Sequence, residues 1–302
     1  MSCSIIFSSA WVDGSRLEKD LLSSCNPHES GEYDIKFIFP IGCSIMIDAA
    51  VRILSLVNQL DFACRMVTLD FEEGESGAMG YLNRMGFFDH LSTNIKILPH
   101  RPSRSGADAY RGSNPYLVEI AQINHQIRDE SLPTRLTDAL MRACNTRPDA
   151  KELEGAAWTI FAELIDNVFS HSETPLDGYA ALQVYPRGDM LLVAVSDSGK
   201  GIMETLRPSL AQEFPSLAHL KDVDLLVEIF RQGISRHGSD RGCGLKGSAS
   251  KALKFKADLD VRLPKVRVFL NPSKNGYTSA YCSDDLPQIW GTHICFKFKF
   301  DS

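Results

Sequence analysis

The chain lacks several patterns that mark common classes of protein. Across its 302 residues no apolar run is long enough to cross a membrane, so we expect no membrane partner. The eight cysteines include no C-x-x-C pair, which argues against a zinc site or a disulfide framework and favours reduced, packed thiols. The N-terminus has neither the basic start nor the small-residue cleavage pattern of a secretory signal, so we expect a cytoplasmic protein.

Familiar catalytic motifs and a strong net charge are missing too. Residues 74–80 contain spaced glycines but no Gly-Lys-Ser/Thr, and there is no G-x-S-x-G or H-E-x-x-H sequence. A P-loop, a hydrolase nucleophile elbow and a zinc-protease helix are therefore excluded. The net charge of −6 argues against a nucleic-acid partner. Basic residues do gather between Lys246 and Arg267, and we expect them to form a solvated face.

The first feature that indicates a function is a predicted helix with two polar residues on one face. Apolar residues recur with a helical period from Trp158 to Phe169, which predicts a helix that packs on a sheet. Glu163 and Asn167 lie four residues apart and so share one face of it. Asn167 could give an oxygen to a hard cation, and Glu163 could polarise a water for attack on a phosphate. The same spacing also fits an ordinary polar face of an amphipathic helix.

A carboxylate at the end of a strand is the second feature. Residues 190–196 predict a buried strand, and Asp197 follows where this strand runs into glycines. A carboxylate there could accept a hydrogen bond from an exocyclic amine, which would distinguish adenine from guanine. Gly199 and Gly201 would let the backbone turn tightly beside a ligand. The alternative is an ordinary Asp-Ser-Gly turn.

A glycine-rich loop before a helix is the third feature. Gly242, Gly244 and Leu245 lead into residues of helical pattern, and the free amides at a helix start suit phosphate oxygens. The alternative is a flexible hinge. The long segment before it, at about residues 202–243, has its own amphipathic stretch, so we expect a lid over a bound ligand.

In this order, the three features resemble those of the GHKL superfamily, the ATP-binding fold shared by gyrase, Hsp90-type chaperones, histidine kinases and MutL. The resemblance extends from about Glu154 to the C-terminus. It implies a Bergerat-type α/β sandwich, a mixed sheet with helices on one face. It also implies that Glu163 is the general base, that Asn167 is the Mg²⁺ ligand and that Asp197 binds the adenine amine.

The same resemblance assigns the glycines and two further residues. Gly199 and Gly201 would shape the adenine side of the pocket, while Gly242, Gly244, Leu245 and neighbouring amides would close on the triphosphate. Thr292 follows Gly291 just before the last predicted strand and would support Asp197 and the adenine through its hydroxyl.

His171 lies one helical turn after Asn167, where members of this superfamily often carry a basic residue that faces the phosphates. By resemblance it would contact the nucleotide. The alternative is a histidine that caps the helix or lies on its surface.

The first hundred residues predict a separate, smaller α/β domain. A strand that ends with Asp70 and Phe71, a turn through Ser76 and Gly77, and a following helix resemble STAS domains. In kinase-regulated members the serine at this turn is phosphorylated, which would be Ser76 here; alternatively Ser76 caps the helix. The predicted strands are residues 35–39, 66–71 and 95–98, and the predicted helices are residues 44–59 and 77–85.

Between the two domains, residues 101–150 predict a linker and two helices, at 116–128 and 134–144. The ATP-binding domain would then span residues 151–302. Its strands are expected at 179–185 and 190–196, which form a hairpin, and within 258–270, 276–282 and 293–300.

The resemblance leaves three functions open, all with ATP and Mg²⁺. The first is an ATPase in which nucleotide closes the lid and changes the relation between domains, or between the subunits of a homodimer. The second is a protein kinase of the anti-sigma or sensor type that phosphorylates a protein partner or its own N-terminal domain. The third is a nucleotide sensor that binds ATP without hydrolysing it.

Overall fold

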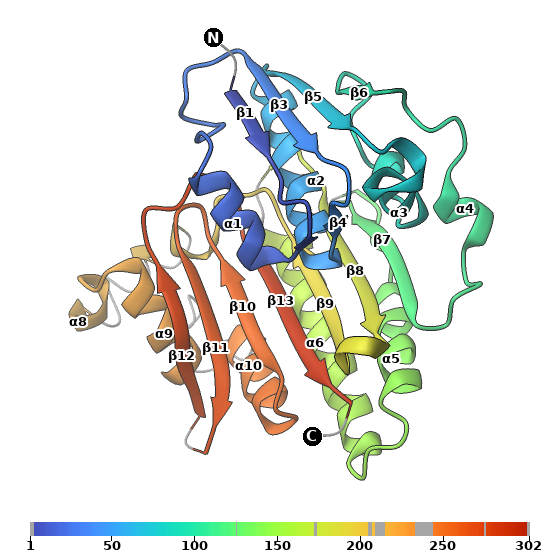
Figure 1. Ribbon diagram of the computed structural model, residues 1–302. Helices are drawn as coiled ribbons and strands as arrows, with labels where there is room; N and C mark the ends of the chain where they lie inside the picture. Colours follow the sequence, from blue (N-terminus) through green and yellow to red (C-terminus); the bar gives the residue numbers. More distant parts are fainter. Residues whose placement is uncertain are drawn as a thin grey trace.

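The computed structural model describes residues 3–124, 126–171, 174–204, 207–208, 215–232, 244–274 and 276–300. The chain has an α/β fold with two main sheets, one parallel and one antiparallel, which are joined through a shared layer of helix (Figure 1). Within the described ranges, no helix is long and apolar enough to cross a membrane.

The N-terminal unit is built on a parallel four-stranded sheet in the order β1-β3-β5-β6. Alternate residues of its strands are buried, among them Phe37 and Leu69, because strand side chains point to opposite faces in turn. The strands are β1 (Cys3–Ile6), β3 (Asp34–Phe39), β5 (Met66–Phe71) and β6 (Lys96–Leu98). The helices are α1 (Gly14–Leu22), α2 (Ile47–Phe62) and α3 (Ala78–Arg84), and β2 (Trp11–Val12) pairs with β4 (Ser44–Ile45).

The predicted strands and helices of this unit are confirmed, but the role of Ser76 is not that of a helix cap. Ser76 ends the short 3₁₀ helix η1 (Gly74–Ser76), and its hydroxyl donates to the carbonyl oxygen of Glu73 at 2.8 Å. The residue at the N-cap of α3 is Gly77. The serine is bound back into its own turn, so the cap interpretation is wrong.

The C-terminal unit is built on a seven-stranded sheet in the order β12-β11-β10-β13-β9-β8-β7. Every neighbouring pair of strands in this sheet is antiparallel, although a mixed sheet was expected. Parallel pairing is found in the N-terminal unit instead. The strands are β7 (Leu117–Ile123), β8 (Gly178–Tyr185), β9 (Met190–Ser196), β10 (Asp258–Arg262), β11 (Arg267–Ser273), β12 (Gly276–Ser283) and β13 (His293–Lys299). The predicted hairpin of β8 and β9 is confirmed, and η3 (Pro186–Gly188) lies at its turn.

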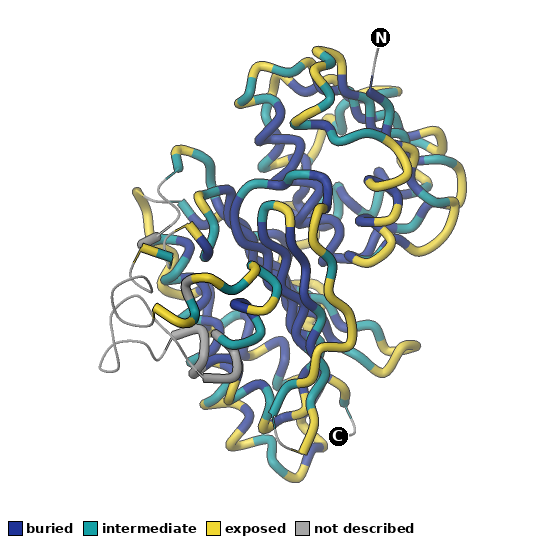
Figure 2. Tube along the Cα trace, turned by 90° about the vertical axis from the view of Figure 1, so that its left-hand side faces the viewer, coloured by how far each residue is buried: buried dark blue, intermediate teal, exposed yellow. Residues whose placement is uncertain are grey.

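Helices cover both faces of this sheet. On one face lie α5 (Leu132–Ala143), α6 (Ala150–His171), α9 (Asp222–Gln232) and α10 (Gly244–Lys254). Leu182 and Val193 point into that core, whereas their neighbours Ala181 and Ala194 point into the core of the N-terminal unit, on the side of α2. Buried residues accordingly run through the strands in the middle of the molecule (Figure 2). The shorter helices are α4 (Gly106–Tyr110), α8 (Pro215–Ala218) and η2 (Phe87–Asp89).

The helix predicted at residues 116–128 is wrong, because this segment supplies the edge strand β7. A register shift between Val118 and Ala121 breaks the alternation of the strand, so Val118, Glu119 and Ile120 are all buried. Glu119 pairs with Arg84 of α3 at 2.7 Å. The predicted helix that follows is confirmed as α5.

The expectation that the cysteines are reduced also needs correction. Cys3 and Cys25 form a disulfide with Cα atoms 6.0 Å apart, although fully reduced cysteines were expected. Cys43, Cys144 and Cys295 are free and buried, as predicted for packing thiols, whereas Cys64 and Cys282 are free and exposed.

A buried network of charges joins the two units. Arg52 of α2 donates to Asp260 of β10 at 2.7 Å, and Arg267 of β11 binds the other oxygen of Asp260 at 2.8 Å. Arg262 binds Glu18 of α1 at 2.9 Å. The expectation of a solvated basic face is therefore wrong for Arg262 and Arg267, whose charges are balanced inside the protein.

Candidate functional site

Helices α6 and α10 pack side by side and bring two of the predicted features together. The hydroxyl of Ser248 in α10 donates to the carboxylate of Glu163 in α6. Further along, Lys254 pairs with Glu152, so later residues of α10 meet earlier residues of α6. The helices are therefore antiparallel. The start of α10 at Gly244, one turn before Ser248, is therefore directed toward the end of α6 that carries Asn167.

Glu163 lies in a partly buried environment that changes its acidity. Burial raises the pKa of this carboxyl, while the hydrogen bond from Ser248 and the charge of Lys251 act in the opposite direction. A carboxylate with a raised pKa is a stronger base than a fully hydrated one. The raised pKa is the direction expected for a general base, and the role of Glu163 stays a prediction.

Asp197 is held in a fixed orientation at the end of β9. Its Oδ1 accepts from the backbone N–H of Gly199 at 2.7 Å, and its Oδ2 accepts from the backbone N–H of Thr292 at 3.2 Å. Its own N–H donates to the carbonyl oxygen of Thr292 at 2.9 Å. Asp197 and Thr292 are thus in contact as predicted, through the backbone of Thr292. The resemblance had implied a contact through the hydroxyl of Thr292 instead.

Two glycines allow the backbone to pass closely by this carboxylate. Gly291 has a φ of 90°, and a Cβ on it would overlap the carbonyl of Asp197 and lie 2.7 Å from its Oδ1. Gly201 has a φ of 79°, and a Cβ there would lie 3.2 Å from the carbonyl oxygen of Gly291. The left-handed backbone and the lack of space both require glycine at position 291.

The C-terminal part of α6 lies against the same end of the sheet. A Cβ on Gly178, at the start of β8, would overlap Val168 of α6 and lie 2.9 Å from the carbonyl oxygen of Ser196. Val168 follows Asn167, and Ser196 precedes Asp197. The turn with Asn167 therefore lies at the same end of the antiparallel sheet as the Asp197 loop, and the antiparallel packing of α6 and α10 directs the start of α10 toward that end.

Several predicted contacts fall outside what the structure describes. Gly242 and three stretches of the predicted lid, residues 205–206, 209–214 and 233–243, lie outside the described residues. His171 is the last residue of α6 and Leu245 is the second of α10, but their side chains are not described. Their contacts with nucleotide stay predictions.

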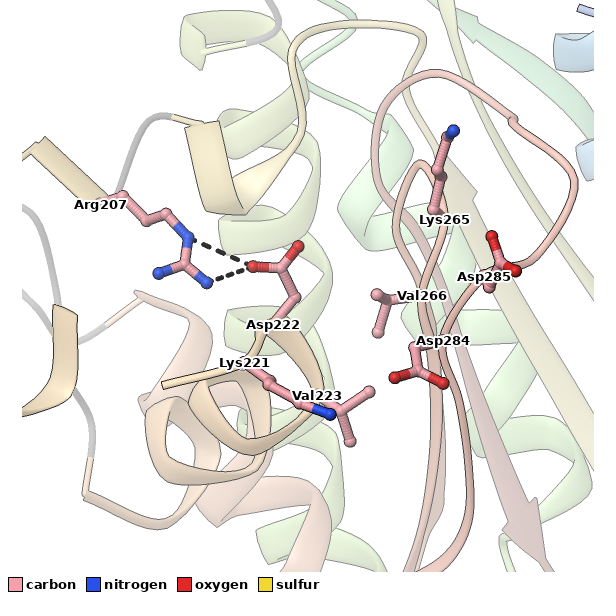
Figure 3. A pocket seen from close by; sticks show the side chains of 8 residues that line it. All are labelled: Arg207, Lys221, Asp222, Val223, Lys265, Val266, Asp284 and Asp285. Atoms are coloured by element: carbon pink, nitrogen blue, oxygen red, sulfur yellow. Dashed lines mark hydrogen bonds and ion pairs between the residues drawn. The ribbon is translucent and has the colours of Figure 1, made fainter. Parts of the chain in front are cut away.

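A separate hollow of about 370 Å³ lies where α9 begins, beside the segment that joins β10 and β11 (Figure 3). Arg207 binds Asp222 across its edge, and Lys265 pairs with Glu29 at 2.5 Å. Because Arg207, Asp222 and Lys265 have partners within the protein and the predicted site residues do not line the hollow, we assign it no ligand.

No protein-family model matches the chain, and no curated protein matches it in sequence. The function is therefore inferred from the residues and their geometry. Sequence patterns had not identified Ser248, although its position four residues after Gly244 places it on the same side of α10.

Proposed function

We propose that the chain binds ATP with Mg²⁺ at the end of the antiparallel sheet and hydrolyses it. The observation that carries this proposal is the hydrogen bond between Ser248 of α10 and Glu163 of α6, which fixes the candidate base, and with it the helix that carries the candidate metal ligand Asn167, against α10. The restrained carboxylate of Asp197 lies at the same end of the sheet. Together these groups match what a purine triphosphate offers: an amine at one end and anionic oxygens at the other.

Asp197 would recognise the base. An ionised carboxylate only accepts hydrogen bonds, so it binds the exocyclic amine of adenine and repels the carbonyl oxygen that guanine has at that position. The two backbone amides that hold Asp197 fix the direction of its lone pairs before the base arrives. Little ordering is then needed on binding, which favours affinity.

The phosphates would lie between the start of α10 and the end of α6. The first N–H groups of a helix have no partner within it, and together with the helix dipole they attract anionic oxygens. Asn167 can donate its amide oxygen to Mg²⁺, which is usually held by few protein ligands together with phosphates and water. When bound, the ion neutralises charge on the phosphates.

Glu163 would then accept a proton from the attacking water. The water oxygen forms a bond to the γ-phosphorus as the bond to the β,γ-bridging oxygen breaks, and ADP leaves with that electron pair. Ser248 donates to only one oxygen of the Glu163 carboxylate, Oε2, so the water would donate to the other oxygen, Oε1. Ser248 would thus hold the base in place during the reaction.

The test is incubation of the purified chain with γ-labelled ATP and Mg²⁺. We expect free phosphate from the wild type, and a loss of at least about 100-fold in rate for Glu163→Gln with ATP still bound. Asn167→Ala should lose Mg²⁺-dependent turnover. Asp197→Asn should lower the affinity for ATP by about 10- to 100-fold, the usual contribution of a hydrogen bond to a charged group.

Glu152→Gln is the matched control, because Glu152 also pairs with α10 but at the far end of α6. It should hydrolyse ATP at the wild-type rate. Label on the protein instead of in free phosphate would favour the kinase function, and binding without either product would favour a sensor. Wild-type turnover by Glu163→Gln would remove this residue from the mechanism.

A further inference from the structure

Helix α2 of the N-terminal unit binds the residues on both sides of Asp197. Ser55 and Gln59 lie four residues apart, and so on one face of α2. The hydroxyls of Ser55 and Ser196 are 2.7 Å apart, and the amide nitrogen of Gln59 donates to the hydroxyl of Ser198 at 3.0 Å. Asp197 therefore sits between two residues that are both fixed by the other unit.

Gln59 also holds the second segment of the site. Its amide nitrogen donates to the carbonyl oxygen of Trp290 at 3.0 Å, and its amide oxygen accepts from the N–H of Trp290 at 2.9 Å. Trp290 directly precedes Gly291 and Thr292, the residues that pack against Asp197. One fully buried side chain thus bridges the two segments that position the carboxylate.

The hydrogen bonds around Ser196 have a defined direction because His293 is neutral. Burial, aided by Arg52 and Arg262, holds the pKa of His293 well below its usual value. Its Nε2 lies 3.0 Å from the carbonyl oxygen of Trp290, so this nitrogen carries the proton and Nδ1 accepts from Ser196. The Ser196 oxygen must then accept from Ser55. The donors therefore run from Ser55 of α2 through Ser196 and His293 to the carbonyl oxygen of Trp290.

His28 completes this contact from the N-terminal unit. Its ring stacks on Trp290 with centroids 4.6 Å apart, and its Nε2 lies 3.3 Å from the amide oxygen of Gln59. Burial lowers the pKa of His28 to about 4, so the ring is neutral near pH 7. The amide of Gln59 thus contacts both His28 and Trp290, and the contact with His28 lets the N-terminal unit set its orientation.

We propose that Gln59 and Ser55 are positioning residues for the adenine end of the site, so that the N-terminal unit controls the affinity of the chain for ATP. This inference rests on the proposed function. A shift of α2 against the sheet moves Ser196, Ser198 and Trp290, and with them the carboxylate of Asp197. Coupling of this kind is reciprocal, so bound nucleotide also stabilises the contact of α2 with the sheet.

The test compares Gln59→Met, which keeps the length of the side chain and removes its hydrogen bonds, with Tyr185→Phe. The hydroxyl of Tyr185 accepts from the N–H of Ile47 at 2.9 Å. Removing this hydroxyl therefore breaks a hydrogen bond between α2 and the sheet at the end of the helix opposite to Gln59. Calorimetry with Mg·ATP and with Mg·GTP gives the affinity, the active fraction and the selectivity of each variant.

We expect Gln59→Met to weaken ATP by about 10-fold, as one or two buried hydrogen bonds would, and to narrow the preference for ATP over GTP at an unchanged active fraction. Tyr185→Phe should match the wild type. A purely structural role would lower the active fraction and leave the affinity of the remaining molecules unchanged. That outcome, or wild-type affinity and selectivity in Gln59→Met, would overturn the proposal.

Two further measurements keep the proposal testable if Gln59→Met does not fold. Ser55→Ala removes a single hydroxyl and should give a smaller loss of ATP affinity in the same direction. In the wild type, hydrogen exchange of the α2 amides should slow when Mg·ATP is added, and unchanged exchange in the presence of bound ATP would contradict the coupling. A wild type that binds no ATP would instead refute the proposed function itself.

Discussion

Gly291→Ala is the most informative single substitution, because the structure gives two separate reasons against a side chain at this position. The backbone φ of 90° lies in the left-handed region, where a residue other than glycine costs about 1–2 kcal/mol. In addition, the new Cβ would lie 2.6 Å from the carbonyl carbon of Asp197 and 2.7 Å from its Oδ1. These contacts are far inside van der Waals distance, so Asp197 must move.

The expected loss of stability follows from comparison with a glycine that has a positive φ but no close contact at its Cβ position. Gly31 has a φ of 74°, but a Cβ there would meet no atom of the described residues within 4 Å. Gly31→Ala should therefore lose only about 1–2 kcal/mol of unfolding free energy. Gly291→Ala should lose a further 1–3 kcal/mol, roughly the cost of overpacking in a well-packed region.

Urea denaturation of both variants measures the loss of stability, and calorimetry with Mg·ATP measures the effect on the site. We expect Gly291→Ala to be less stable than Gly31→Ala and to bind ATP at least about 10-fold more weakly, because the displaced carboxylate loses its hydrogen bond to the base. Equal losses of stability would show that position 291 has room for a Cβ. Unchanged ATP affinity would show that the position of Asp197 does not matter for binding.

Three other predictions test the packing of the units and the chemistry of the site. Arg52→Met should destabilise the chain by about 3 kcal/mol in urea denaturation, the lower end for a broken buried ion pair. The loss is at the lower end because Asp260 keeps Arg267, and Glu18, whose Oε1 lies 3.6 Å from Arg52, keeps Arg262. A loss below about 1 kcal/mol would contradict the network. Ser248→Ala removes the hydrogen bond that lowers the pKa of Glu163, so the acid limb of the ATPase pH profile should move to higher pH, and a shift to lower pH would refute the assignment. Gly155→Ala, on the exposed face of α6 with no described atom near the new Cβ, should stabilise the chain by about 0.5–1 kcal/mol, and a lower melting temperature would count against the helix there.

The sequence predicted most helices and strands correctly where one period dominated. It failed at β7, because the register shift between Val118 and Ala121 places three consecutive side chains in the interior and spaces the apolar residues as in a helix. Helix α1 was not predicted, although Asp13 gives a usable signal: its carboxylate accepts from the N–H of Arg16 at 2.8 Å, as an N-cap does.

The candidate site was predictable only in part, for a physical reason. Glu163, Asn167 and Asp197 lie in local patterns that can be recognised along the chain. Their partners do not: Ser248 is 85 residues from Glu163, and Gln59 is 139 residues from Ser198. Such contacts arise from the packing of the units, as does the burial of Arg262, and no local spacing encodes them.

The measurement that tests the central claim most directly is calorimetric titration of the purified chain with Mg·ATP, alongside Asp197→Asn. The account predicts heat that saturates at one nucleotide per chain for the wild type, with affinity reduced by about 10- to 100-fold in the variant. No heat from the wild type, or equal affinity in the two proteins, would contradict it.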